Sequence, residues 1–248
     1  MLHLHFKADA DPSNILDTDA LEIFQFEWGI YQTLVQSNSM NHREIADLLR
    51  ELIDTHFDRP FTFIDLACGD SSLAHTVLEG SQVARYEGLD LSRPALQCGA
   101  EIMKEVPYEV DLDEEDMVAG IARRPESADM IWCGFSIHHL RTDQKQEMLA
   151  SIRQALKPGG IFVCVEPVNA AGETRADYTG RWHHELKKRF AVLSDEEFDH
   201  IWDHIRTHDF PETPETWVEM GEKAGFSKSR QVFRMPGDLF CGGFLFEK

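Results

Sequence analysis

Short apolar runs alternate with amphipathic segments through most of the chain, and this pattern predicts a layered α/β fold. The first buried strand is predicted in the run FTFIDLA, which begins at Phe61. Four similar runs follow it, RYEGLDL, YEVDL, ADMIWCG and GIFVCVEP, and helical spacing fills the segments between them. Such alternation is typical of a parallel sheet covered by helices on both faces. We therefore expect a doubly wound α/β sheet.

The pattern differs at both ends of this alternating region. Two helices, Asp19–Gln36 and Asn41–Phe57, are predicted before the first strand. After the fifth strand, residues 169–214 carry charged, aromatic and histidine-rich helical sequence, which we interpret as a helical lid insertion. A helix over Glu215–Ala224 and two strands joined at Met235-Pro236-Gly237 then end the chain, and this short joint predicts antiparallel neighbours.

Charge and cysteine content narrow the classes of partner. The chain has 44 acidic and 24 basic residues, a formal net charge of −20, so it should be repelled by nucleic acid and by anionic membrane surfaces. A neutral or cationic small molecule fits this charge better. The five cysteines are odd in number and form no CxxC pair, and no apolar run approaches the roughly 20 residues of a membrane span. We expect a reduced, cytoplasmic protein.

The turn FIDLACGDSS, which follows the first strand, carries the strongest candidate chemistry. Against the dinucleotide-binding pattern GxGxxG it supplies Ala67, Gly69 and Ser72, so only one glycine is present. Asp65 and Asp70 flank the turn, and the chain has no lysine or arginine between positions 60 and 85. A pyrophosphate would meet two carboxylates and no cation there. The turn therefore favours a ligand with a positive centre.

The ends of the next two strands suggest what else this ligand contains. Asp90 ends the second strand, where an acid can accept from both hydroxyls of a ribose. Asp111 is predicted to end the third strand and to accept from an exocyclic amine such as that of adenine, although Asp113 and Glu114 are competitors in the same acidic run. Adenosine combined with a sulfonium-bearing amino acid is S-adenosylmethionine.

Four motifs in order, FIDLACGDSS, EGLDLS, ADMIWCGFSIHHL and ALKPGGIFVCVEP, resemble those of class I S-adenosylmethionine-dependent methyltransferases of the small-molecule type. The resemblance covers roughly residues 61–167. It implies a Rossmann-like, mostly parallel seven-stranded sheet with an antiparallel last strand. It also implies S-adenosylmethionine as the cofactor and S-adenosylhomocysteine as its product.

The resemblance further implies which residues bind the cofactor. The methionine part is matched to Asp65, Ala67 and Gly69, and the ribose to Asp90 and Leu91. The adenine is matched to Asp111 and Leu112, and the floor beneath it to Cys133 and Ser136. Two positions depart from the family pattern. Ala67 replaces a usual glycine, and Asp70 stands where a small or hydroxyl residue is usual, so Asp70 either contacts the ammonium group or caps the next helix.

His138 and His139 follow the fourth strand and are the candidate catalytic residues. A histidine at this edge could remove a proton from a substrate hydroxyl, amine or thiol. The alternative is that one histidine packs under the sheet and the other caps a helix. Methyl transfer can also proceed by alignment and desolvation alone.

Aromatic and charged residues outside the motifs form a candidate substrate chamber. Its members are Trp28, Tyr31, Glu166, Arg175, Tyr178, Trp182 and His183. In the same insertion His200, His204 and His208 recur every four residues, a spacing that can bind a metal, but an amphipathic lid helix explains them better and no metal is expected.

These features together predict a cytoplasmic enzyme that transfers a methyl group from S-adenosylmethionine to an oxygen, nitrogen or sulfur atom of a small molecule. The expected division is a helical cap (1–58), a cofactor-binding core (59–168), a lid (169–214) and a C-terminal helix with a strand pair (215–248). The alternatives are a non-catalytic regulatory protein that binds the cofactor, a protein methyltransferase and a nicotinamide-dependent oxidoreductase.

Overall fold

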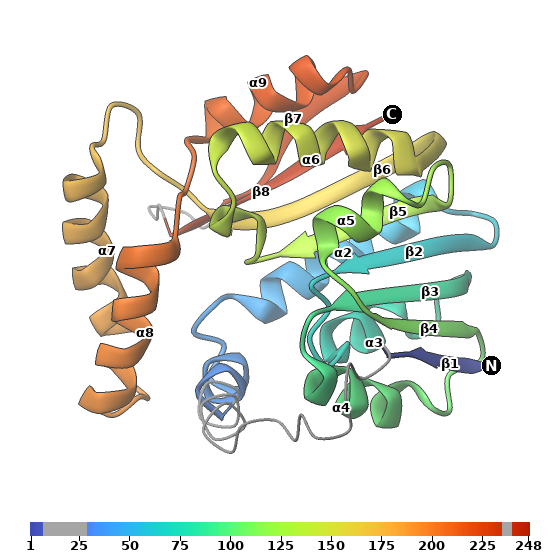
Figure 1. The fold of residues 1–248 in the computed structure, drawn as a ribbon, viewed down its shortest axis with the longest axis horizontal. Helices are drawn as coiled ribbons and strands as arrows, with labels where there is room; N and C mark the ends of the chain where they lie inside the picture. Colours follow the sequence, from blue (N-terminus) through green and yellow to red (C-terminus); the bar gives the residue numbers. More distant parts are fainter. Residues whose placement is uncertain (7–28, 235–239) are drawn as a thin grey trace, which may run out of the picture. The chain divides into compact units, whose positions relative to one another are not determined.

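The computed structural model describes residues 1–6, 29–234 and 240–248 and contains one eight-stranded sheet in the order β1-β4-β3-β2-β5-β6-β8-β7 (Figure 1). The strands are β1 (Leu2–His5), β2 (Phe61–Leu66), β3 (Val83–Asp90), β4 (Glu109–Glu114), β5 (Ala128–Gly134), β6 (Leu156–Pro167), β7 (Lys228–Arg234) and β8 (Cys241–Glu247). Neighbouring strands from β1 to β6 are parallel, whereas β8 is antiparallel to both β6 and β7. The expected fold class is confirmed.

The sheet has one strand more than the seven that we predicted. β1 lies at the edge and pairs in parallel with β4, with Leu2 beside Val110 and Leu4 beside Leu112. Its sequence, LHLH, is only four residues long and three of them are exposed, so it lacks the apolar run by which the other strands were recognised.

Two layers of helices cover the two faces of the sheet (Figure 1). One layer contains α3 (Ser72–Leu78) and α4 (Arg93–Met103), and the other contains α5 (Met117–Ala122), α6 (Thr142–Ala155) and α9 (Pro214–Ala224). Several helix ends follow simple capping rules, because the side chain of Ser92 accepts from the N–H of Ala95 and that of Thr213 accepts from the N–H of Thr216. The helices thus begin where their sequences supply a cap.

The main apolar core lies between the strands and the layer of α5, α6 and α9. Ile64, Ile131 and Phe162 project into it from β2, β5 and β6, and Trp217 enters from α9. Gly221 lets α9 approach β8 closely, since a Cβ atom at this position would lie 2.4 Å from a ring carbon of Phe246. This core holds the strand ends in a fixed relation to one another.

The chain divides into two compact units. Among the described residues, the first comprises 1–6, 46–172, 210–234 and 240–248, and the second comprises 29–45 and 173–209. Residues 1–6 and 46–58 therefore belong with the sheet, whereas we predicted a helical cap over 1–58. α2 (His42–His56) begins in the second unit and continues into the first.

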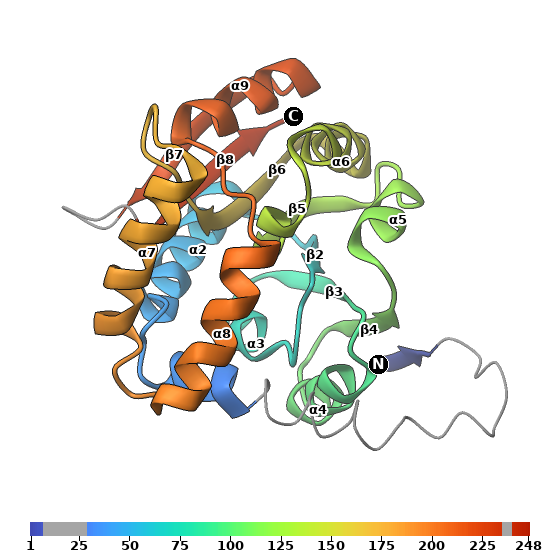
Figure 2. The same cartoon turned by 60° about the vertical axis from the view of Figure 1, so that its left-hand side comes forward.

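The second unit contains α7 (Arg175–Arg189) and α8 (Asp195–His208), which lie side by side in Figures 1 and 2. Each helix begins with a capping box, formed by Thr174 with Asp177 and by Ser194 with Glu197. Of the predicted helix Asp19–Gln36, residues 29–36 are described and are helical, and the rest lies outside the described residues. Among the helices that the structure describes, none has the length and apolar character needed to cross a bilayer.

Candidate functional site

The carboxyl ends of three neighbouring strands lie at one level of the sheet. Leu66, the last residue of β2, is in register with Leu89 of β3 and with Cys133 of β5, and β6 runs past this level to Pro167. The segments that follow these strands therefore meet at one edge, where ligands bind in open α/β sheets.

The turn after β2 has an unusual backbone conformation. Ala67, Gly69 and Ser71 have φ angles of 55°, 55° and 59°, in the left-handed region. Glycine adopts this region readily, but alanine and serine do so at a cost. Strained positions of this kind concentrate at ligand-binding sites, so the turn is the first element of the candidate site.

Asp90, at the end of β3, holds this turn in place. One carboxylate oxygen accepts the N–H of Gly69 at 2.8 Å and the other accepts the N–H of Ser92 at 2.8 Å. Burial raises the pKa of Asp90, and hydrogen bonds from the backbone of Ser92, Gly69 and Leu91 oppose that shift. The side chain of Leu91 lies next to it and is 63% exposed. Asp90 thus connects the ends of β2 and β3.

Asp65 is a buried carboxyl group at the same edge. Its side chain accepts a hydrogen bond from the Tyr86 hydroxyl at 3.0 Å. Burial raises its pKa to about 8; the Tyr86 hydrogen bond acts in the opposite direction, and the charges of Asp90 and Asp70 add to the rise. Asp70 itself accepts the N–H of Ser72 and so caps the turn into α3. Tyr86 was not predicted as a site residue, although it is a polar aromatic residue in the buried strand β3, which pairs with β2.

The structure corrects the expected place of Asp111. β4 continues to Glu114, so Asp111 lies three residues before the strand end, in register with Glu87 rather than with Asp90. Its carboxylate forms an ion pair with Arg85 at 2.9 Å and lies 3.6 Å from Nε2 of His5, and the neighbouring Leu112 is fully buried. The expectation that Asp111 ends its strand is therefore wrong, while its assignment to the adenine stays a prediction.

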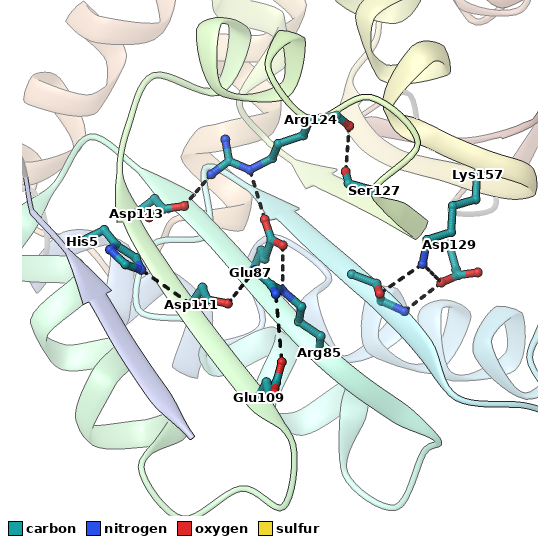
Figure 3. A network of polar contacts seen from close by, with 11 residues as sticks. His5, Arg85, Glu87, Glu109, Asp111, Asp113, Arg124, Ser127, Asp129 and Lys157 are labelled. Carbon is teal, nitrogen blue, oxygen red and sulfur yellow. Dashed lines mark hydrogen bonds and ion pairs between the residues drawn. The ribbon is translucent and has the colours of Figure 1, made fainter.

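Asp111 belongs instead to a charged network on the face of the sheet that α5 covers (Figure 3). Arg124, just after α5, donates to Glu87 at 3.0 Å and to Glu115 at 2.7 Å, and it also pairs with Asp113. Arg85 of β3 pairs with Glu87 at 2.8 Å. The acidic run at the end of β4 is thereby tied to β3 and α5, so most of its carboxylates have a structural role.

The expected floor residues lie at and after the end of β5. Cys133 is fully buried in the apolar core, where burial raises the pKa of its thiol well above the usual value. The structure thus gives no support for contact between this thiol and a cofactor. Ser136 is half-buried and its hydroxyl donates to the carbonyl of Gly134. Phe135, between them, has a φ of 51°, which is a strained conformation for a bulky residue and was not predicted from the sequence.

The two candidate catalytic histidines lie in a short 3-10 helix, η1 (Ile137–His139), directly after β5. His138 is 6% exposed, and its Nδ1 atom lies 2.7 Å from a carboxylate oxygen of Glu166 on β6. The ring centroids of His138 and His139 lie 4.1 Å apart, and His139 is exposed. Glu166 is fully buried and contacts His138, and its expected contact with substrate stays a prediction.

The other expected substrate residues belong to the second unit. Tyr31 is 39% exposed and its hydroxyl lies 3.4 Å from His42, while Arg175 donates to the carbonyls of Arg206 and Asp209. Tyr178 and Trp182 are buried with their rings 5.1 Å apart. Trp28 lies outside the described residues.

The histidine-rich helix of this unit has a packed side and an open side. His183 of α7 packs edge-on against Trp202 of α8 at 4.8 Å. On α8 the rings of His204 and His208 are 5.0 Å apart and both residues are exposed, and His200 is half-buried. These contacts are those of an amphipathic helix packed against its neighbour.

Comparison with known families is consistent with the geometry of the sheet edge. Residues 64–162 match a family described as a methyltransferase domain. Among curated proteins, carboxy-S-adenosyl-L-methionine synthase of Pseudomonas putida is 34% identical over 103 residues. These residues make up 42% of this chain, and the match spans only 41% of the length of that relative. An uncharacterized methyltransferase of Bacillus thuringiensis is 25% identical over 149 residues, which is 58% of this chain and 66% of that protein.

Solved structures show the same fold at low sequence identity. An O-methyltransferase family protein from Burkholderia thailandensis aligns with a TM-score of 0.63 and 16% identity, covering 94% of this chain and 60% of that chain. A cyclopropane synthase from Mycobacterium tuberculosis aligns with a TM-score of 0.54 and 18% identity, covering 76% of this chain and 62% of that chain.

Proposed function

We propose that the chain, whose residues 64–162 match a methyltransferase domain, is a class I S-adenosylmethionine-dependent methyltransferase that transfers the methyl group to a small-molecule acceptor. The attacking atom of the acceptor is an oxygen, nitrogen or sulfur. The observation that carries this proposal is the turn after β2, which combines a left-handed backbone with the buried carboxyl group of Asp65 and the half-buried carboxyl group of Asp90.

The residues of the turn fit the cofactor. Asp65 is buried, its described hydrogen-bond partner is a tyrosine hydroxyl, and the sequence from 61 to 84 contains no lysine or arginine. An acidic cluster without a nearby base suits a ligand that carries an ammonium and a sulfonium group. A bound cation would also lower the pKa of Asp65 and so stabilise its ionised form.

Each residue of this edge has a proposed role. Asp65, Ala67, Gly69 and Asp70 bind the methionine part, Asp90 and Leu91 bind the ribose, and Ser136 lies beneath the adenine. When bound, the cofactor supplies an electrophilic methyl group with a neutral thioether as leaving group. The protein orients the acceptor for in-line attack and excludes water, and a histidine after β5 accepts the acceptor's proton.

A small-molecule acceptor is favoured by the charge of the chain. The formal net charge of −20 opposes binding to nucleic acid. Tyr31, Arg175, Tyr178, Trp182 and His183 of the second unit are proposed to contact the acceptor. We propose no metal for His200, His204 and His208.

Two other functions are distinguishable by experiment. The relatives in Pseudomonas putida are named for the synthesis of carboxy-S-adenosyl-L-methionine, so this chain could modify the cofactor itself. A regulatory protein would bind the cofactor without turnover. Mass spectrometry after incubation with S-adenosylmethionine and a small-molecule cell extract, which supplies a methyl acceptor or a donor of the added group, separates these cases. Methyl transfer yields S-adenosylhomocysteine, modification yields a heavier sulfonium compound, and a regulator leaves S-adenosylmethionine intact.

The first test is calorimetric titration with S-adenosylmethionine, S-adenosylhomocysteine and NADH in one buffer. We expect the two adenosyl ligands to bind and NADH to give no heat of binding. If neither adenosyl ligand binds, the proposed function is overturned.

The variant Asp90→Ala tests the ribose assignment. Loss of charge-assisted hydrogen bonds should weaken binding of S-adenosylmethionine by about 2 kcal/mol or more, which is roughly 30-fold in Kd. Asp54→Asn, which removes an exposed carboxylate from α2, is the control and should leave Kd unchanged. An unchanged affinity in Asp90→Ala would refute the ribose assignment.

A further inference from the structure

A pocket with a volume of about 320 Å³ lies at the edge of the sheet opposite the candidate functional site. It forms where α3 and α4 end and where β3 and β4 begin, whereas the candidate site lies where the strands end. Leu78, Val83, Ile102 and Val106 give it an apolar surface. Pockets that bind small molecules begin at about 300 Å³ and are mostly apolar. This pocket therefore has the size and the surface to take the body of a small organic molecule.

The charged side chains at this pocket are acidic. Glu79 follows α3 directly and Glu105 lies just after α4, and both line the pocket and are exposed. Neither carboxylate forms an ion pair with a described residue, and the described lining contains no lysine or arginine. Lys104, the neighbour of Glu105, pairs with Glu101 at 3.1 Å instead. The two carboxylates therefore leave an uncompensated negative charge at the pocket.

The backbone and an aromatic ring add to the attraction for a cation. Both α3 and α4 end at the pocket, and the last carbonyl groups of a helix carry a partial negative charge. Tyr108 is 8% exposed and lines the pocket, and the face of an aromatic ring attracts a cation. His75 is the other titratable side chain of the lining, and a neutral imidazole can accept a hydrogen bond from an ammonium group. Carboxylates, helix ends and an aromatic ring thus all favour a positive charge here.

We propose that this pocket is a second ligand site, which binds a small organic cation that carries an amine on an apolar or aromatic body. The apolar surface takes the body, and Glu79 and Glu105 lie on either side of the ammonium group. Anionic ligands such as phosphates and nucleotides are repelled by the same two carboxylates. The inference does not rest on the proposed function, because the pocket and the cofactor site lie at opposite edges of the sheet.

The test compares a probe amine with two analogues that differ in charge. The probe is 4-phenylbutylamine, and the analogues are neutral 4-phenylbutan-1-ol and anionic 4-phenylbutyrate. Each is added to the full chain labelled with ¹³C at the methyl groups of leucine, valine and isoleucine, and the methyl signals are followed by NMR. We expect saturable shifts at Leu78, Val83, Ile102 and Val106, whose signals are identified by single conservative substitutions such as Ile102→Val. The amine should bind about fivefold more tightly than the alcohol, and the acid should bind most weakly.

Two variants remove the charges without changing the size of the side chains. Glu79→Gln and Glu105→Gln should each lower the affinity for the amine about two- to fivefold and leave the affinity for the alcohol unchanged. Glu51→Gln, which changes an exposed carboxylate of α2 outside the pocket, removes the same charge from the chain and is the matched control. It should leave both affinities unchanged.

The proposal is overturned by any of three results. Equal affinities for the amine and the alcohol in wild type would show that the pocket does not select a cation. Shifts that do not saturate, or that appear only away from the four apolar residues, would show that the pocket is not a binding site. An equal loss of affinity in Glu51→Gln would assign the preference for the amine to the net charge of the whole chain.

Discussion

At the scale of single residues, the turn after β2 contains strain that one substitution should relieve. Ala67 has a φ of 55°, where a Cβ atom is unfavourable. Ala67→Gly should raise the free energy of unfolding by about 0.5–1 kcal/mol, because the relief of strain exceeds the added chain entropy of glycine. Urea denaturation measures the change.

Ala150→Gly is the matched control, because Ala150 lies inside α6 and its backbone is helical. Glycine there should lower the free energy of unfolding by about 0.5–1 kcal/mol. The two substitutions are chemically identical and should have opposite signs. Equal losses in both would show that Ala67 is not strained.

The buried carboxyl of Asp65 should make the stability of the ligand-free protein depend on pH. Its pKa is raised from 3.8 to about 8 in the folded state. Between these values the folded state holds a proton that the unfolded state has lost, so stability falls as pH rises, by up to about 1.4 kcal/mol per pH unit. Asp65→Asn removes this titration, so its stability relative to wild type should increase from pH 5 to pH 8, as measured by urea denaturation.

Asp129 provides a comparison of opposite sign. Burial alone would raise its pKa, but hydrogen bonds from Lys157 and from the N–H of Thr62, together with the charges of Lys157 and Arg59, lower it. Its contribution to stability is therefore present above the unfolded pKa of 3.8 and is lost as pH falls through the folded value.

If the stability of Asp65→Asn followed the same pH dependence as that of wild type, the raised pKa of Asp65 would be refuted.

At the scale of elements, the sequence predicted the strands whose composition is distinctly apolar. β2, β5 and β6 are buried on both faces, which gives continuous runs of large aliphatic and aromatic residues. The short edge strand β1 buries too little to leave such a signal. Its pairing depends on β4, which is about one hundred residues away in the sequence.

The site was predictable only in part for a related reason. Asp65, Gly69 and Asp90 follow apolar runs closely, and the structure brings their turn and strand ends together. Asp111 lies in an alternating acidic run, where the end of the strand cannot be read from the pattern. The roles of Glu166 and Tyr86 depend on contacts across neighbouring strands, which no single stretch of sequence contains.

The charged network in Figure 3 should be a stabilising link between β3, β4 and α5. Arg124 serves Glu87, Asp113 and Glu115, and its side chain is only 16% exposed. Arg124→Ala leaves these poorly solvated carboxylates without that cation and should cost about 2–3 kcal/mol in urea denaturation. The free energy of unfolding of Arg124→Lys should lie between those of wild type and Arg124→Ala, because an ammonium group cannot reproduce the forked hydrogen bonds of a guanidinium group.

An exposed ion pair in the same unit serves as the control for Arg124. Lys104 pairs with Glu101 on the surface of the chain, where the two side chains are 54% and 77% exposed. Lys104→Ala should cost less than about 0.5 kcal/mol. A loss in Arg124→Ala no larger than this would show that the network is not a link that stabilises the sheet.

At the scale of the whole molecule, the excess of acidic groups should make stability depend on salt. The formal net charge is −20, so compact structure brings like charges together at neutral pH. Raising NaCl from about 0.01 M to 0.5 M shortens the screening length from about 30 Å to a few ångströms, which should raise the Tm. The pH provides the control, since near the isoelectric point of about 4.9 the net charge disappears and the same addition of salt should change the Tm little. An equal rise at both pH values would indicate a general effect of salt on burial rather than relief of repulsion.

If the rise is confined to neutral pH, a bound cationic cofactor should also stabilise the fold by neutralising part of the negative charge. The increase in Tm that the cofactor causes should then become smaller as NaCl is added.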